Sequence, residues 1–247
     1  LRGLTLAGGV GVGLVEDVQL ESVRVRPGLR EETLALHRTS ARLFDVDLQG
    51  GPEAALSVTN ATVTVSGLRV RAPASSRAVR VASSRVEISG ARLRGGRVAT
   101  VQVSGTSTVR LDRVRLEDTA GSGLLALDGA AVTLERSRVW RAGGAGLSAR
   151  GARLEVAGST VTGSQVAALD ARGARVRVVG GRLEAGEDAA VRVGAEGGRG
   201  ASVELRGTEL HHPGRSAARV AHGRIALYDV RVVGARTSTP SPGSAPA

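Results

Sequence analysis

Residues 147–183, LSARGARLEVAGSTVTGSQVAALDARGARVRVVGGRL, hold two copies of one pattern. Leu147, Ala149, Leu154, Val156 and Val161 recur 22 residues later as Leu169, Ala171, Val176, Val178 and Leu183. Within each copy the aliphatic residues come in pairs two positions apart, with a polar or small residue between them. This spacing is typical of β-strands, because successive side chains of a strand point to opposite faces.

The same spacing can be followed along nearly the whole chain. One aliphatic residue anchors the third strand of each unit, and these anchors are 22 or 23 residues apart, with one step of 27. The anchors are Val25, Leu48, Val70, Leu93, Leu116, Val139, Val161, Leu183, Leu210 and Val232. The sequence therefore predicts ten coils of three short strands over residues 10–234. Glycine three positions before an anchor, as at Gly67 and Gly158, marks a sharp corner between strands.

A single coil of this kind cannot bury its aliphatic side alone, so the coils must stack into three parallel sheets around one core. Connections between parallel strands are overwhelmingly right-handed, and the sequence predicts an all-β, right-handed parallel β-helix. A leucine-rich repeat would need a recurring Asn or Cys, but Asn60 is the one Asn and there is no Cys. A left-handed β-helix repeats in hexapeptides, which gives a shorter coil than this one.

The coils resemble those of the pectate-lyase-like superfamily, right-handed parallel β-helix proteins of bacterial surfaces and secreted carbohydrate-active enzymes. The resemblance covers about residues 10–234 and concerns the repeat pattern, without a catalytic signature. It implies that an enzyme of this type would place its site on the face of the first strands or in the loops beside it.

Domain boundaries follow from the repeat. Residues 1–234 form one β-helix domain, in which residues 1–9 are a partial coil, and residues 235–247 (ARTSTPSPGSAPA) have the composition of a linker or tail. The long step comes from residues 195–200 (AEGGRG), and a tolerated change of loop length is favoured there over a functional loop. The chain begins inside repeat-like sequence without Met, which is typical of an excised domain or mature fragment.

Composition narrows the function classes. The net charge is +11 and every basic residue is Arg, a bias typical of GC-rich bacterial coding. The chain has no Cys, so it has neither disulfides nor thiolate metal ligands. The chain contains no run of 18 apolar residues, so the sequence predicts no membrane-spanning helix. With one Phe, one Trp and one Tyr, aromatic platforms for nucleic-acid bases are almost lacking, and a nucleic-acid partner is not expected.

Stacked coils align equivalent residues into ladders. The residue before each anchor is Arg in seven of the ten coils, and in four consecutive coils it is Arg69, Arg92, Arg115 and Arg138. We call these four the arginine strip. Like charges about 5 Å apart repel by roughly 0.8 kcal/mol in water. Anions that bind along the strip would therefore reduce the repulsion between neighbouring Arg residues. Trp140 lies beside Arg138 and can stack on a sugar ring or cover a turn. The strip and Trp140 are candidate ligand-binding residues for an acidic polysaccharide or lipopolysaccharide; the alternative is that an Arg-biased genome fills exposed positions with Arg.

Catalytic and metal-binding candidates are few. Asp170 and Arg192 occupy neighbouring coils in the row of first strands and form a weak candidate acid–base pair. The predicted rows bring together no cluster of three carboxylates, and His37, His211, His212 and His222 are too scattered to share a metal. We therefore expect no metal and no cofactor. Asp45 and Asp47 are near one another in the sequence, but Asp47 stands between Arg24 and Arg69 in its row, and a salt bridge is expected there.

These observations favour a non-catalytic surface or secreted β-helix domain of bacterial origin, acting as a rigid spacer or a binder of acidic polysaccharide outside the cell or in its envelope. The alternative is a carbohydrate-active enzyme, either a polysaccharide lyase or a glycoside hydrolase, with an unrecognised site. The sequence leaves open the identity of the ligand and the oligomeric state.

Overall fold

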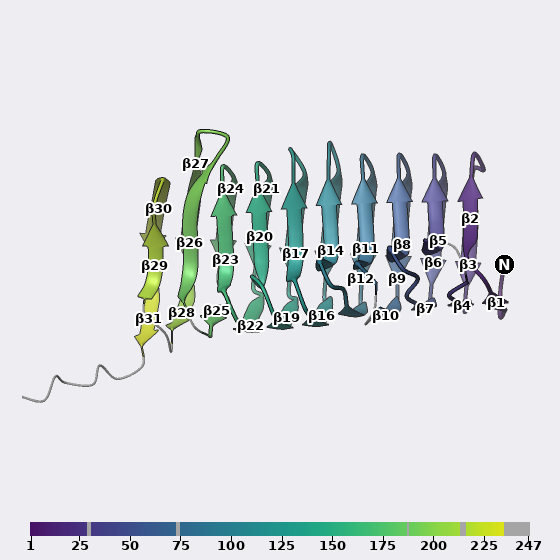
Figure 1. Ribbon diagram of the computed structural model, residues 1–247, viewed down its shortest axis with the longest axis horizontal. Helices are drawn as coiled ribbons and strands as arrows, with labels where there is room; N and C mark the ends of the chain where they lie inside the picture. Colours follow the sequence, from purple (N-terminus) through teal and green to yellow (C-terminus); the bar gives the residue numbers. More distant parts are fainter. Residues whose placement is uncertain (29–30, 73–74, 187, 213–215, 235–247) are drawn as a thin grey trace, which may run out of the picture.

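The structure is a computed structural model that describes residues 1–28, 31–72, 75–186, 188–212 and 216–234. These residues contain 31 strands and no helix. The strands follow one another in groups of three, and the chain winds as the predicted right-handed parallel β-helix, a rod whose coils lie side by side along its length (Figure 1). The expected tail, residues 235–247, lies outside the described residues.

The first strands of the coils form a parallel sheet that we call sheet 1. Its neighbours pair in register from one coil to the next, as in Leu147 with Leu169. Its strands are β2 (Val10–Gly13), β5 (Glu32–His37), β8 (Ala54–Thr59), β11 (Arg77–Ala82), β14 (Ala99–Ser104), β17 (Ser122–Leu127), β20 (Leu147–Arg150), β23 (Ala167–Arg172), β26 (Ala189–Glu196) and β29 (Ser216–Val220).

The second strands form sheet 2, also parallel, in which Leu134 pairs with Leu111 on one side and with Val156 on the other. Its strands are β3 (Val18–Glu21), β6 (Ser40–Phe44), β9 (Thr62–Ser66), β12 (Arg85–Ser89), β15 (Thr108–Asp112), β18 (Ala131–Glu135), β21 (Arg153–Ala157), β24 (Arg175–Val179), β27 (Arg199–Arg206) and β30 (Gly223–Tyr228).

The third strands form sheet 3, which carries one additional strand, β1, ahead of the first complete coil; β1 pairs with β4. Its strands are β1 (Thr5–Ala7), β4 (Arg24–Arg26), β7 (Asp47–Gln49), β10 (Arg69–Ala72), β13 (Arg92–Gly95), β16 (Arg115–Thr119), β19 (Arg138–Ala142), β22 (Thr160–Ser164), β25 (Arg182–Ala185), β28 (Glu209–His212) and β31 (Arg231–Gly234).

The core is narrow and almost wholly built from Val, Leu and Ala. The predicted anchors from Val25 to Leu210 are at most 1% exposed, and Val232 in the last strand is 51% exposed. Alternation along each strand sends every second side chain outward; in β9, for example, Val63 and Val65 are buried while Thr62, Thr64 and Ser66 are exposed. The outward rows of the three sheets therefore hold the polar chemistry of the molecule.

The corner before sheet 3 has one backbone conformation in every coil. The residue three positions before the anchor has a φ between 47° and 71°, in the left-handed region. Gly fills this position in five coils, and Ser22, Asp45, Arg113, Arg136 and Asp229 fill it in the others. Glycine adopts this conformation freely, whereas an L side chain raises its energy. The sharp corner predicted from the glycines is thus a property of all ten coils.

The long step in the ninth coil is a hairpin. Strands β26 and β27 continue past their neighbours and pair antiparallel through Ala195 with Gly200 and Glu196 with Arg199. This hairpin rises above the other coils in Figure 1. No helix that could cross a membrane occurs in the described part of the chain.

Candidate functional site: the arginine face of sheet 3

The arginine strip is one continuous ladder on sheet 3. Arg69 pairs in register with Arg92, Arg92 with Arg115, and Arg115 with Arg138. All four side chains are exposed, because they alternate with buried anchors on strands β10, β13, β16 and β19. Since parallel strands lie about 4.8 Å apart, the backbone holds the four side chains at a regular interval along the rod.

The ion pairs of the four differ from one rung to the next. Arg69 lies 3.5 Å from Asp45, and Arg92 lies 2.9 Å from Glu117, whose side chain is only 9% exposed. Arg115 has no carboxylate within 4 Å among the residues that the structure describes, although it stands between two other Arg residues. The positive charge of the ladder is therefore only partly neutralised.

A second outward row widens the cationic surface. Arg71 and Arg94 pair in register beside the strip, and together with Arg69 and Arg92 they border a hollow of about 370 Å³ on the sheet. Arg94 contacts Asp118 at 2.7 Å, whereas Arg71 has no carboxylate within 4 Å in the described ranges. Four of the five residues that line the hollow are thus Arg, and the fifth is Val70.

Trp140 lies at the end of the strip, in the second row between Glu117 and Thr162, as its position in the repeat predicts. The guanidinium carbon of Arg141 is 3.6 Å from the centre of its ring, and that of Arg138 is 5.7 Å away. Arg141 is itself held by Asp118 at 2.5 Å. Arg141 therefore covers one face of the indole, and a sugar could stack only on the part of the ring that remains half-exposed.

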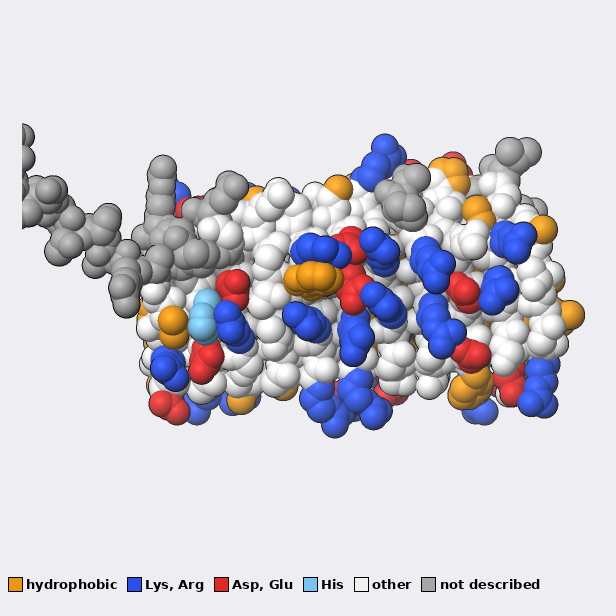
Figure 2. Space-filling view, turned by 90° about the horizontal axis from the view of Figure 1, so that it is seen from below, with side chains coloured by type: hydrophobic (Ala, Val, Ile, Leu, Met, Phe, Trp, Pro, Cys, Tyr) orange, Lys and Arg blue, Asp and Glu red, His pale blue; other side chains and the backbone are white. Residues whose placement is uncertain are grey.

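The view from below shows this face (Figure 2). Basic side chains gather over the middle and N-terminal part of sheet 3, with acidic side chains interspersed among them and a hydrophobic side chain at the centre. The strip and its surroundings contain seven Arg residues and four carboxylates, namely Arg69, Arg71, Arg92, Arg94, Arg115, Arg138 and Arg141 with Asp45, Asp47, Glu117 and Asp118. The face has a surplus of positive charge that can attract an anionic polymer.

The candidate catalytic pair lies on sheet 1, where Asp170 and Arg192 stand in register on β23 and β26. Their charged groups have other partners: Asp170, which is 6% exposed, lies 3.2 Å from Arg172, and Arg192 lies 3.6 Å from Asp188. Both residues border a hollow of about 320 Å³ at the base of the β26–β27 hairpin. The structure therefore places the two residues side by side without an ion pair between them.

Asp112, in sheet 2, forms ion pairs with two Arg residues at the corners of neighbouring coils. Burial opposes ionisation of Asp112, but hydrogen bonds and charge from Arg136 at 2.6 Å and Arg113 at 3.0 Å outweigh it and lower its pKa below the usual value. Both Arg residues occupy the left-handed corner position. Asp112 thus ties together two corners that lack glycine.

No group of three His, Asp or Glu side chains is placed to hold a metal ion in the described part of the chain. His211 contacts Glu209 at 3.3 Å, and Asp47 lies 3.5 Å from Arg24. Asp47 thus forms the expected salt bridge, with Arg24, while Arg69 pairs with Asp45 instead.

Asp118 and Arg141 are members of the cationic face that the sequence analysis did not identify. Both lie within strands of sheet 3, β16 and β19, and have a φ in the left-handed region, at 55° and 57°. They are 23 residues apart in the sequence, one coil step, and this spacing was the signal that could have paired them.

No protein-family model matches this chain, and no curated protein matches it in sequence. Its similarity to solved structures is one of fold. The periplasmic alginate epimerase AlgG superposes with a TM-score of 0.57 at 8% identity, over 93% of this chain and 77% of the epimerase. Tailspike protein 3 of bacteriophage CBA120 superposes with a TM-score of 0.65 at 13% identity, over 97% of this chain and 44% of the tailspike. These proteins share the right-handed parallel β-helix.

Proposed function

We propose that this protein is a non-catalytic β-helix domain, secreted or held in the bacterial envelope, that binds an acidic polysaccharide along sheet 3. The observation that carries the proposal is the ladder of Arg69, Arg92, Arg115 and Arg138, which is in register over four consecutive coils and exposed along its length. An extended polymer with carboxylates at repeated intervals matches a surface with cations at repeated intervals.

The ion-pair pattern supports this proposal. Arg71 and Arg115 can contact an anion without first losing a carboxylate partner, and the hollow between Arg69 and Arg94 offers a concave seat beside them. The remaining guanidinium groups have several N–H donors, so an ion pair with one carboxylate leaves donors for a second. Binding would therefore add contacts to the face rather than exchange them.

The structural neighbours agree with this class of ligand. An alginate epimerase acts on a polysaccharide and is periplasmic, and a tailspike belongs to a phage particle. At identities of 8% and 13% these similarities give the fold alone, and the ligand class is inferred from the chemistry of sheet 3. Lipopolysaccharide, which carries phosphate and carboxylate groups, would contact the strip in the same way.

Retention on immobilised polygalacturonate at low salt tests the proposal. We expect replacement of all four strip residues by Gln to abolish retention, because Gln keeps most of the side-chain stem and removes the charge. The matched control replaces four exposed Arg residues outside sheet 3 by Gln, namely Arg42, Arg80, Arg85 and Arg150. Equal loss in the two variants would show that net charge alone holds the polymer, and the strip would be rejected.

The single Trp gives a second measurement on the unmodified protein. Because Trp140 lies between Arg138 and Arg141, a polymer on the strip changes the surroundings of the indole. We expect the fluorescence of Trp140 to change in a saturable manner with polygalacturonate and to return as salt is added. A fluorescence signal that does not respond to the polymer would contradict binding at this end of the strip.

A carbohydrate-active enzyme is the second candidate function. It is favoured by the hollow on sheet 1, where the nearly buried Asp170 lies beside Arg192. This function predicts new reducing or unsaturated sugar ends when the protein is incubated with acidic glycans, and their loss in Asp170→Asn. Sugar ends formed equally by Asp170→Asn would exclude this site.

A further inference from the structure

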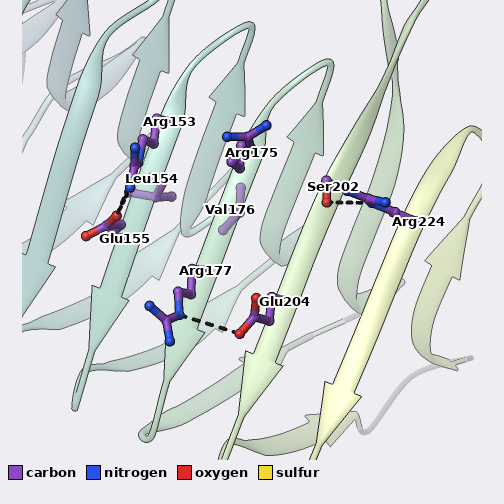
Figure 3. A pocket seen from close by; sticks show the side chains of 9 residues that line it. All are labelled: Arg153, Leu154, Glu155, Arg175, Val176, Arg177, Ser202, Glu204 and Arg224. Atoms are coloured by element: carbon purple, nitrogen blue, oxygen red, sulfur yellow. Dashed lines mark hydrogen bonds and ion pairs between the residues drawn. The ribbon is translucent and has the colours of Figure 1, made fainter.

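A separate hollow lies on sheet 2, in the C-terminal half of the rod. It has a volume of about 210 Å³ and is bordered by outward side chains of β21, β24, β27 and β30. Figure 3 shows these side chains from close by. This hollow lies on a different sheet from the arginine strip and shares no residue with it.

A gap in a row of Arg residues creates the hollow. Arg153, Arg175, Ser202 and Arg224 occupy equivalent positions and pair in register across four coils. The short Ser202 leaves the space of one long side chain between Arg175 and Arg224, whose strands lie two sheet spacings, roughly 10 Å, apart. In Figure 3 the side chain of Arg224 reaches toward Ser202 from the side of β30.

The hydroxyl of Ser202 is available as a donor. The Nε–H of Arg224 donates to Ser202 Oγ at 3.0 Å. The hydroxyl therefore accepts a hydrogen bond and keeps its own hydrogen, and no acceptor for that hydrogen is found among the described residues. Ser202 thus presents a polar hydrogen at the floor of the gap.

The carboxylates of the hollow already have partners. Glu155 accepts hydrogen bonds from Arg153 at 2.6 Å and 3.1 Å, and Glu204 contacts both Arg206 and, at 3.5 Å, Arg177. Arg175 and Arg224, by contrast, have no carboxylate within 4 Å in the ranges that the structure covers. Two guanidinium groups without a counterion therefore flank a concave gap with a hydroxyl between them.

We propose that this gap binds an oxyanion, a carboxylate or phosphate group, held by Arg175 on one side, Arg224 on the other and the hydroxyl of Ser202. Guanidinium groups match the geometry of both oxyanions and form charge-assisted hydrogen bonds with them. The anion offsets the repulsion between the stacked Arg residues, and the apolar rod beneath the hollow strengthens the attraction. The group can belong to a small molecule or to a residue of a longer chain.

The experiment is calorimetric titration of the whole protein with two probes, inorganic phosphate and monomeric galacturonate, at low salt. The informative variant is Ser202→Arg, which fills the gap while it adds a positive charge. The site predicts loss of binding, whereas attraction by general charge predicts binding that is equal or stronger. Arg175→Gln should weaken binding about tenfold or more, because it removes a charge-assisted hydrogen bond.

Arg85→Gln is the matched control. Arg85 occupies the same row in an earlier coil, is exposed, and lies between Thr62 and Thr108 without a gap of this kind. Saturable binding of either probe that Ser202→Arg abolishes and Arg85→Gln leaves unchanged would support the site, and the probe that binds identifies the oxyanion. No saturable binding to the unmodified protein, or undiminished binding to Ser202→Arg, would overturn it. Circular dichroism confirms that each variant is folded, and retention on polygalacturonate reports on sheet 3 separately.

Discussion

Arg115 offers a prediction in which stability and binding change in opposite directions. It stands in register between Arg92 and Arg138 and has no carboxylate partner among the described residues. Arg115→Gln keeps the stem of the side chain and removes a charge that two neighbours repel. We therefore expect this variant to have a higher free energy of unfolding than the unmodified protein and a weaker affinity for an acidic polymer.

The magnitude follows from the spacing of the strands. Two unit charges about 5 Å apart repel by roughly 0.8 kcal/mol in water. A Debye length of about 30 Å at 0.01 M salt leaves most of this repulsion, whereas one of about 8 Å at 0.15 M leaves about half. For the two neighbours together the gain is at most about 1.4 kcal/mol at 0.01 M and about 0.9 kcal/mol at 0.15 M, and the pairing of Arg92 with Glu117 lowers both values.

Arg92→Gln, one rung away, is the control. It also removes a charge between two Arg residues, but it leaves the nearly buried Glu117 without its partner at 2.9 Å. A hydrogen bond to a charged group contributes about 1.5–3 kcal/mol. The stability of Arg92→Gln should lie below that of Arg115→Gln by about this amount.

Urea unfolding followed by circular dichroism, at both salt concentrations, measures these differences. The reasoning is refuted if Arg115→Gln is no more stable than the unmodified protein at 0.01 M salt, or if its gain does not shrink as salt is added. A gain of equal size in Arg92→Gln would show that the pair with Glu117 contributes nothing.

Three further predictions concern the fold. Leu134→Ala, in a fully buried rung, should lower the free energy of unfolding by about 2.7–5 kcal/mol in a urea titration. Gly146→Ala should be destabilising, because the added Cβ would overlap Val161 Cγ1, and a lower thermal midpoint would show this. Asp112→Asn should be less stable than the unmodified protein at pH 7. Because folding lowers the pKa of Asp112, its contribution is present above 3.8 and is lost as pH falls through the folded pKa, so the two unfolding curves should converge in acid.

The stacked coils and their outward rows could be predicted from the sequence, because burial of the repeated aliphatic residues fixes both. Leu134 and Val156 are 22 residues apart, which is the length of one coil, and they pair in neighbouring strands of sheet 2. Because both side chains must face the core, the register of the strands between them is fixed. The row of Arg69, Arg92, Arg115 and Arg138 followed directly, since an outward position beside a buried anchor has nowhere else to point.

The partners of those side chains could not be predicted in the same way. Arg69 reaches back to Asp45 and Arg92 reaches forward to Glu117, and this choice depends on rotamers that the repeat does not encode. The stacking of Arg141 on Trp140 depends on the left-handed backbone conformation of Arg141 within β19. The hairpin of β26 and β27 was expected only as extra length, because the six residues that form it carry no strand periodicity.

The register of sheet 3 has a consequence for how such a surface can change over time. Main-chain hydrogen bonds set the interval between successive outward positions, and the identity of the outward residue has no part in it. A single amino-acid substitution can therefore change one outward side chain of sheet 3 without moving the residues above and below it. Thr160, Arg182 and Glu209 already stand at the three positions of this row that come after the strip. The spacing of the outward positions is thus fixed, whereas the residues at these positions are free to vary. Selection for a different polymer would need only substitutions at these positions, with the backbone unchanged.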